Sequence, residues 1–274
     1  MSNLQHRLQW LEPAWPAPPQ VHALSLLRSG GMSQGLFASL NPALHVGDEE
    51  ADVRENRRRI RDFFSLPDEP LWLNQVHGIK VSDCSDTTPG PQADGSYARG
   101  FDRVCAVLTA DCLPILLCDH GGQEVAALHA GWRGLAAGVI ESALTVFRSP
   151  PEQLMACLGP AIGAGAFEVG EEVRELFCQQ HEDQDLITES HREGHWFADL
   201  QGLARRRLER LGVSALFSMG GCTFTEKEDY FSFRRDQQCG RMATLIWLSD
   251  HPRVEASRIR VDDSGGGFYR CQAK

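Results

Sequence analysis

The longest apolar stretch of the sequence runs from Val104 to Cys118 and is broken by Asp111 and Pro114. It is too short, and too polar in its middle, to cross a bilayer, which takes about 20 apolar residues. Short apolar runs bounded by turn-forming residues are typical of buried strands. We therefore interpret this stretch as two strand segments on either side of the sequence TADCLP, inside the core of a globular protein.

Further strand-like and helix-like segments follow without a regular alternation. Strands are predicted over Val21–Leu27, Leu71–Val76, Val125–Leu128, Met155–Leu158, Ala215–Met219, Tyr230–Phe233 and Met242–Leu248. Helices are predicted over Asp52–Phe64, Leu135–Phe147, Glu171–Gln180 and Leu200–Leu211. This irregular order favours an α+β fold over a doubly wound parallel sheet. Because no linker justifies a domain cut, residues 1–248 are predicted to form a single domain, followed by a C-terminal tail, 249–274, that is partly ordered at best.

The net charge and the pattern of cysteines limit the classes of protein to which this chain can belong. The chain has 37 acidic and 27 basic residues, a formal net charge of −10, and a surface of that sign repels nucleic acid and anionic membranes. The N-terminal sequence MSNLQHRLQW lacks the apolar core of a signal peptide, and the nine cysteines include no CxxC pair. We expect a cytoplasmic protein with reduced thiols and without a zinc ribbon or a thioredoxin-type motif.

Three apolar segments end at a residue that could do chemistry. The sequences LNQVHG, LTADCLP and ALHAGWRG place His77, Cys112 and His129 beside Gly or Pro at the end of a predicted strand. Rigid strand ends commonly hold catalytic groups, and His and Cys are preferred zinc ligands. Three protein ligands leave a fourth position for water, whose pKa zinc lowers to about 7. We predict a catalytic zinc site, and a metal-free Cys112 nucleophile with a histidine base stays open as the alternative.

Polar residues near these segments are candidates for binding a small polar ligand. Arg133 lies near the start of a predicted helix, where an anion is favoured, and a surface ion pair is the alternative. Arg234 and Arg235 would face opposite sides of a strand, so only one can enter a given pocket. Asp111 could orient a ligand histidine or cap a turn, and Asn41 could bind a ligand or form a turn. The predicted substrate-binding residues are Asn41, Gln75, Asp111, Arg133 and Arg234.

Longer motifs connect these features. The segments SLNPALHVGDEEADVRENRRRI, LNQVHG, QADG, TADCLPILLCD, ALHAGWRGL, CLGPAIGAGAFEVG, FADL, GCTF and YFSFRRDQQCGRMATLIWL occur in this order. Together they resemble the YfiH-type laccase-domain family, also called multicopper polyphenol oxidoreductases and described as purine nucleoside phosphorylases. The resemblance runs from about Pro16 to Leu248. Departures are LLRSGG for Thr-Thr-Arg-x-Gly-Gly, NPALHVGD for Asn-Leu-x-x-His-Val-Gly-Asp, and Phe233 for a common Tyr, so we expect a different rim on the N-terminal side of the site.

The resemblance implies a single-domain α+β fold of layered mixed β-sheets flanked by helices, with a site similar to that of the cytotoxic necrotizing factor deamidases. It implies that His77, Cys112 and His129 are the metal ligands, with zinc as the metal and copper as an alternative. The implied activities are phosphorolysis of adenosine, inosine, guanosine and methylthioadenosine, and deamination of adenosine. The implied partners are a nucleoside and phosphate. The oligomeric state stays open, with a monomer favoured.

Other functions stay open beside this one. One bacterial branch of the family is linked to correcting peptidoglycan precursors, which the same Cys/His site could hydrolyse. Multicopper phenol oxidation would need closely paired His ligands, and the ten histidines include no HxH motif. Copper in a His/Cys/His site would then give only adventitious oxidation. A non-enzymatic binding module is a further alternative, because fold alone does not decide function.

Overall fold

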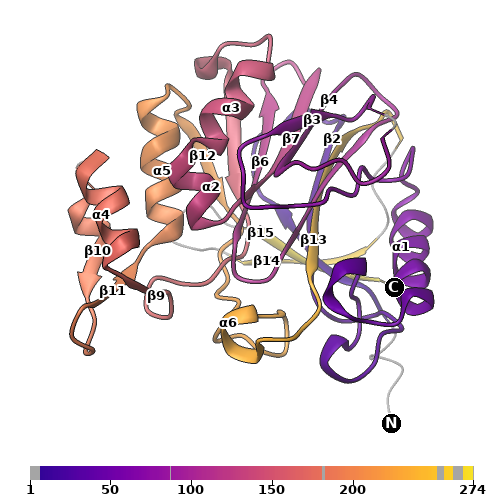
Figure 1. The fold of residues 1–274 in the computed structure, drawn as a ribbon. Coiled ribbons are helices and arrows are strands. Elements are labelled where there is room, and N and C mark those ends of the chain that lie inside the picture. Colours follow the sequence, from indigo (N-terminus) through magenta and orange to yellow (C-terminus); the bar gives the residue numbers. More distant parts are fainter. Residues whose placement is uncertain (1–6, 87, 181–182, 252–255, 262–267, 274) are drawn as a thin grey trace.

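The computed structural model describes residues 7–86, 88–180, 183–251, 256–261 and 268–273. Two six-stranded sheets form its centre, and a small three-stranded sheet lies beside them (Figure 1). The first sheet has, in spatial order, the strands β14 (Ala256–Val261), β15 (Phe268–Ala273), β1 (Gln9–Pro13), β2 (Val21–Leu26), β13 (Met242–Leu248) and β5 (Val104–Thr109). The second has β12 (Ala215–Ser218), β8 (Leu154–Leu158), β6 (Leu113–Asp119), β7 (Glu124–Ala130), β4 (Gly95–Arg99) and β3 (Val81–Asp83). The third has β10 (Ile187–Glu189), β11 (His195–Ala198) and β9 (Glu168–Gly170).

The two large sheets pack face to face across one apolar core. Val107 and Ile246 of the first sheet share this core with Leu116 and Ala127 of the second. Every residue of β6 is buried, because helices cover the other face of this sheet, and strands buried on both faces are continuous apolar runs. The second sheet is mixed, since β3–β4 and β8–β12 pair in parallel and the other pairs are antiparallel.

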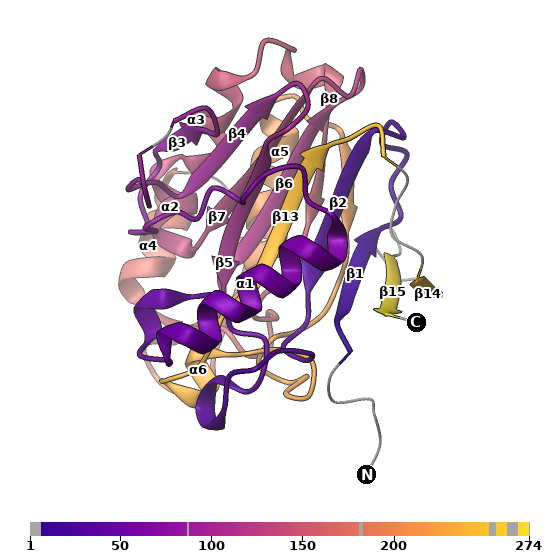
Figure 2. The ribbon, with the colours of Figure 1, turned by 90° about the vertical axis from the view of Figure 1, so that its right-hand side faces the viewer.

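Helices cover the outer faces of both sheets (Figure 1). The described helices are α1 (Glu50–Phe64), α2 (Trp132–Ala137), α3 (Val139–Val146), α4 (Glu171–Gln180), α5 (Leu200–Arg210) and the short α6 (Phe233–Asp236). Of these, α4 lies beside the third sheet and α6 lies below the two large sheets (Figure 1). Figure 2 shows α1 lying across the first sheet, where the rings of Phe64 and Trp10 meet edge to face at 5.0 Å. Leu135, Val139 and Leu203 of α2, α3 and α5 pack on the second sheet. The layered α+β architecture that the sequence predicted is therefore confirmed.

Some predicted elements are corrected. The helix predicted over residues 135–147 is two helices, because Gly138 takes the left-handed conformation with φ of 106° and ends α2. Residues 230–233 form no strand. Phe233 instead begins α6, and the Ser232 side chain caps this helix by accepting the N–H of Arg235. Of the strand predicted over residues 71–76, only isolated bridges at Leu71 and Asn74 are present.

The C-terminal segment expected to be partly ordered at best contributes two strands. β15 pairs antiparallel with β1, and β14 pairs antiparallel with β15, so the segment extends the first sheet. Cys271 of β15 lies opposite Trp10 and is buried. Residues 256–261 and 268–273 form strands because the edge of β1 offers them hydrogen-bond partners, and the prediction that the segment as a whole is partly ordered at best stays a prediction. Among the described helices, none is long and apolar enough to span a membrane.

Candidate active site

The three residues predicted as metal ligands come together at one end of the second sheet. Cys112 lies in the turn between β5 and β6, His129 near the end of β7, and His77 in the segment before β3. Their candidate ligand atoms all lie within 4.8 Å of one another. The Sγ of Cys112 is 3.8 Å from the Nε2 of His77, and the centroids of the two imidazole rings are 4.8 Å apart.

The pairing of β6 with β7 explains why Cys112 and His129 are neighbours. Pro114 lies opposite His129 in this pairing, so the turn before β6 meets the end of β7. Gly131 follows β7, and a Cβ atom there would lie 3.0 Å from both the Cys112 Sγ and the Cδ2 of His77. A residue without a side chain is therefore needed where the backbone passes the cluster.

A buried carboxylate that the sequence analysis did not single out holds two of these residues. Asp94, directly before β4, is fully buried. It accepts hydrogen bonds from the backbone N–H of His77 and from the ring Nδ1 of His129, both at 2.8 Å. It also accepts the N–H groups of Gly78 at 2.6 Å and Val76 at 3.2 Å. The signal in the sequence is the motif QADG, an acid between small residues directly before an apolar strand.

Charges within the cluster change two pKa values. Burial raises the pKa of the Cys112 thiol, but the charge of His129 and hydrogen bonds with both histidines outweigh burial and lower it to about 6. Burial lowers the pKa of His129, but Cys112 and Asp94 outweigh burial and raise it to about 9. Near neutral pH the metal-free cluster therefore holds a Cys112 thiolate beside a protonated His129. A thiolate is the form of cysteine that acts as a nucleophile and as a metal ligand.

The donor set of this cluster fits a metal ion. Zinc binds His nitrogen and Cys sulfur in a tetrahedron, and catalytic zinc sites use three protein ligands. Because Asp94 occupies the Nδ1 of His129, the Nε2 of that ring is the atom left for a metal. Cys112 and both histidines line a common cavity, which leaves a fourth position accessible. Imidazole and thiolate also suit copper, so the residues fit either metal.

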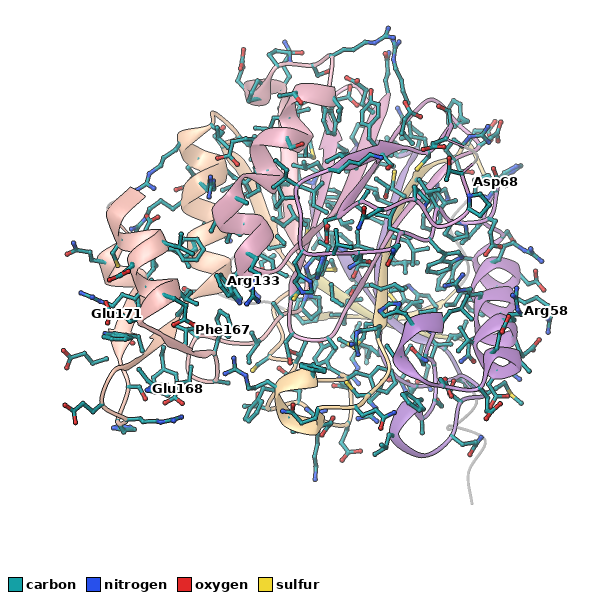
Figure 3. All side chains as sticks on the ribbon, viewed as in Figure 1. Arg58, Asp68, Arg133, Phe167, Glu168 and Glu171 are labelled. Atoms are coloured by element: carbon teal, nitrogen blue, oxygen red, sulfur yellow. The ribbon has the colours of Figure 1, made fainter. Side chains whose placement is uncertain are left out.

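This cavity has a volume of about 430 Å³ and a wall that combines arginines with aromatic rings. The guanidinium carbon lies 4.1 Å from the ring centroid in the Arg133–Trp132 pair, 5.4 Å in Arg234–Phe167 and 5.7 Å in Arg241–Phe233. Figure 3 shows Arg133 and Phe167 on the side of the site that faces α4. None of these three arginines forms an ion pair within the described part of the chain. The cavity therefore offers guanidinium groups without ion-pair partners beside flat apolar surfaces.

Two predicted substrate-binding residues line the cavity but use their polar atoms within the protein. The amide of Gln75 bonds both the N–H and the C=O of Leu108, each at 2.8 Å. The carboxylate of Asp111 accepts the Thr223 hydroxyl at 2.7 Å and the backbone N–H of Arg234 at 2.6 Å. Asp111 therefore joins loops, and the carboxylate that orients the ring of His129 is Asp94.

Asn41 and the arginine pair at 234–235 also differ from expectation. Asn41 is fully buried outside the cavity wall, and its Oδ1 accepts the N–H groups of Ala43 and Arg241. Asn41 thus forms a turn that holds Arg241, which is the alternative that the sequence left open, and its contact with substrate stays a prediction. Arg234 lines the cavity, whereas Arg235 donates to the carbonyl oxygens of Thr223, Phe224 and Tyr230. One of the pair enters the cavity, but from a helix and not from a strand.

The sequence analysis missed His45 and Arg241, which both line the cavity. Burial lowers the pKa of His45, and the nearby charges of Arg241, Arg57 and His129 lower it further, so this ring is neutral at pH 7. His45 and Leu108 also line a neighbouring cavity of about 930 Å³ between α1 and the segment 68–74. The motif NPALHVGD could have indicated His45 as a site residue. No local sequence pattern indicates Arg241, because its position in the cavity wall depends on the turn at Asn41.

Two layered sheets with a Cys/His/His cluster at one end define an α+β protein with a group of residues that could hold a metal ion. Two solved structures share this fold. One is Neisseria meningitidis NMB0706, with a TM-score of 0.84 and 45% identity over 88% of this chain and 99% of that one. The other is YlmD from Geobacillus stearothermophilus, with a TM-score of 0.81 and 29% identity over 88% and 96%.

Sequence comparison identifies the family. The family model described as multi-copper polyphenol oxidoreductase laccase matches residues 22–249, and the chain belongs to this family. The protein named purine nucleoside phosphorylase YfiH of Escherichia coli (strain K12) is 47% identical over 237 residues, which cover 86% of this chain and 97% of that protein. Purine nucleoside phosphorylase PA4543 of Pseudomonas aeruginosa is 46% identical over 242 residues, which cover 88% and 99%. The family that the motifs resemble is thus confirmed.

Proposed function

We propose that the chain is an enzyme that cleaves purine nucleosides with phosphate, with adenosine, inosine, guanosine and methylthioadenosine as substrates. The observation that carries this proposal is a single cavity that joins the Cys112 cluster to uncompensated arginines resting on aromatic rings. The names of the relatives support the same reaction. In this reaction a phosphate oxygen bonds to C1′ of the ribose, the C1′–N9 bond breaks, and the purine leaves with the electron pair and takes up a proton.

The residues of the cavity have separate tasks in this proposal. The flat faces of Trp132, Phe167 and Phe233 suit stacking against a purine ring. Arg133 and Arg234 present planar guanidinium groups, which bind phosphate oxygens in pairs. Stacking and ion pairing together hold the two reactants side by side, which is a large part of the rate acceleration of a two-substrate reaction.

We propose zinc as the metal at His77, Cys112 and His129, with copper as the alternative. When bound, the ion supplies a Lewis acid that orients a polar atom of the substrate. The lowered pKa of Cys112 favours the thiolate that binds a metal, and the hydrogen bond from Nδ1 to Asp94 leaves the Nε2 of His129 as the ligand atom. Elemental analysis of the purified protein tests this proposal. About one equivalent of zinc, lost in Cys112→Ala, supports it, and copper in its place supports the alternative.

Deamination of adenosine is proposed as a second activity, because three ligands with an accessible fourth position are typical of hydrolytic zinc sites. In this reaction water replaces the amino group of the purine, and ammonia leaves. Hydrolysis of a peptidoglycan precursor at the same cluster is the alternative function.

The decisive experiment is product analysis of adenosine incubated with the protein, with and without phosphate. Adenine that forms only with phosphate supports phosphorolysis, and inosine in both buffers supports deamination. Cys112→Ala should abolish both products, whereas Cys178→Ala, on α4 outside the cavity wall, should leave them unchanged. If neither product exceeds the Cys112→Ala background, the nucleoside proposal is wrong and the peptidoglycan precursor is tested next.

The arginines have a separate test. Arg133→Gln and Arg234→Gln should each raise the KM for phosphate by about tenfold or more, since a bond to a charged partner is worth about 1.5–3 kcal/mol. The KM for adenosine should change less. Arg205→Gln on α5, outside the cavity wall, is the control. An unchanged KM for phosphate in both cavity variants would contradict their proposed role.

A further inference from the structure

We propose that Asp94 is a positioning residue that sets both histidines of the metal site, an inference that rests on the proposed metal site. The carboxylate takes four hydrogen bonds: from the Nδ1 of His129 and the N–H of His77 on one oxygen, and from the N–H groups of Gly78 and Val76 on the other. No part of its side chain is exposed. Asp94 thus bonds the ring of one predicted ligand and the backbone of another.

The contact with His129 selects the nitrogen available to a metal. An ionised carboxylate only accepts hydrogen bonds, so the Nδ1 of His129 must carry a hydrogen. In the neutral ring that binds a metal, the lone pair is then on Nε2, which faces the cluster. A carboxylate behind a ligand histidine fixes the ring and raises its basicity, and removing such a partner commonly weakens metal binding about 10–100-fold.

The contacts with residues 76–78 hold the other histidine. His77 has φ of 61°, a left-handed conformation that is uncommon for residues other than glycine. Asp94 bonds three consecutive N–H groups across this turn, as an anion does in a backbone nest. The backbone C=O of Asp94 also accepts the N–H of His129 at 2.7 Å. One residue therefore ties the strained turn to β7.

Asp94→Asn tests this proposal. An amide keeps one accepting oxygen and places N–H groups toward two N–H donors, so one half of the contact is lost. Zinc affinity, measured by chelator competition, should fall about 10–100-fold. Asp119→Asn is the matched control, because Asp119 is a buried carboxylate that accepts N–H groups of Gly121, Gln123 and Glu124 in a turn outside the cavity wall. The zinc affinity of Asp119→Asn should stay within about twofold of the wild-type value. Equal zinc affinity in Asp94→Asn and the wild type would overturn the proposal.

A second measurement needs no variant and does not depend on nucleoside turnover. Nitrogen–proton NMR spectra of the imidazole groups, in zinc-loaded and in metal-free wild-type protein, report which nitrogen of His129 carries hydrogen. We expect a hydrogen-bonded Nδ1 proton in both forms. An unprotonated Nδ1 in either form shows that Asp94 does not hold the ring. If the ring is held but no purine product forms, the proposed function is wrong and the inference about Asp94 stands.

A different observation carries a second inference, about the cavity of about 930 Å³ between α1 and the segment 68–74. We infer that this cavity binds the phosphate group of a small molecule at Arg57. Helical spacing puts Arg54, Arg57, Arg58 and Arg61 on its wall. Three of them have carboxylate partners: Arg54 pairs with Glu50, Arg58 with Glu55 and Asp62, and Arg61 with Asp62 and Glu69.

Arg57 has no such partner in the described part of the chain. Its Nε donates to the C=O of Pro42 at 2.8 Å, and its guanidinium carbon lies 4.4 Å from the ring centroid of Trp72. Burial lowers the pKa of Arg57 and the nearby carboxylate of Glu69 raises it, so the value falls only to about 10 and Arg57 keeps its charge at pH 7. A half-buried guanidinium that forms no ion pair, and whose two terminal nitrogens make no hydrogen bond within the described structure, is suited to bidentate binding of a phosphate group.

Calorimetric titration with inorganic phosphate and with adenosine 5′-monophosphate tests this inference, in a protein that also carries Arg133→Gln and Arg234→Gln. In that background one saturable site should remain, and Arg57→Gln should weaken it about tenfold or more. Arg59→Gln, on the same helix but outside the cavity wall, is the control. Tighter binding of the nucleotide identifies an organic phosphate as the ligand, and equal binding identifies the free ion. No saturable site, or equal binding in Arg57→Gln, overturns the inference.

Discussion

The carboxylate of Asp111, on the wall of the candidate active site, accepts the hydroxyl of the fully buried Thr223 at 2.7 Å. Asp111 takes the left-handed conformation, with φ of 88°, directly before Cys112. Its second carboxylate oxygen accepts the N–H of Arg234. One side chain thus joins the loop of Cys112 to the two segments that follow β12. The position of Cys112 and that of Arg234, the proposed phosphate-binding residue, are therefore coupled.

Thr223→Val tests this coupling. The change keeps the shape of the side chain but leaves one oxygen of a buried carboxylate without its donor, at a cost of about 1–3 kcal/mol. Urea denaturation should show this loss, and the alkylation rate of Cys112 in metal-free protein should change. Thr145→Val is the control, because Thr145 is exposed and bonds only the nearby C=O of Ser142. A variant as stable as the wild type would contradict the expected cost.

Gly131→Ala is expected to disturb the cluster without backbone strain elsewhere. The new methyl group would lie 3.0 Å from the Cys112 Sγ and from the Cδ2 of His77, closer than ordinary contact allows, so these ligands must move apart. Zinc affinity should fall about tenfold or more, because metal sites require ligand distances within about 0.2 Å. Gly165→Ala is the matched control, since nothing lies within 4 Å of its added methyl group. Zinc bound equally by both variants would refute the crowding argument.

Gln75→Leu separates a structural role from substrate binding. The leucine removes both hydrogen bonds to the backbone of Leu108. We expect a loss of about 1–3 kcal/mol in the free energy of unfolding, with the KM for adenosine changed by less than about threefold. The two quantities come from denaturation and from steady-state kinetics. A large rise in KM with unchanged stability would support the prediction that Gln75 binds substrate.

The ionisation of Glu124 makes the free energy of unfolding of the protein depend on pH. Burial raises the pKa of this carboxyl, but hydrogen bonds from the Tyr97 hydroxyl and the N–H groups of Arg148 and Ser149 outweigh burial and lower it below its usual value. The unfolded chain then binds more protons than the native one, so the stabilisation is complete above about pH 4.3 and is lost as the pH falls through the native value. Glu124→Gln should therefore be less stable than the wild type at pH 7.

The difference in stability between Glu124→Gln and the wild type should shrink at pH 3.5, measured by urea denaturation at both values. Glu152→Gln, at an exposed position, should follow the wild type throughout. A difference that stays constant between pH 7 and pH 3.5 would show that ionisation of Glu124 is not its source.

Local patterns predicted those parts of the fold whose signal lies in neighbouring residues. The bounds of β13 and α4 match the predicted segments Met242–Leu248 and Glu171–Gln180, because a continuous apolar run and an amphipathic repeat are visible within one window. The strand predicted for the short segment YFSF, residues 230–233, was wrong. Its aromatic residues are typical of a strand, but the Ser232 cap starts a helix there. A side-chain cap of one residue outweighs β propensity over four residues.

The sequence by itself determined the long buried strands such as β13, the order of the motifs and the three residues of metal-ligand type, since each rests on residues adjacent in the chain. The tertiary structure alone decided that Asp94 holds His77 and His129, and that Arg241 completes the cavity wall. It also showed that Asn41 is fully buried. Hydrogen bonds between residues far apart in the chain depend on how the strands are ordered in the sheets. The strand order cannot be read from a local sequence pattern. The residues around each hydrogen-bonding partner show only the pattern of their own strand or turn.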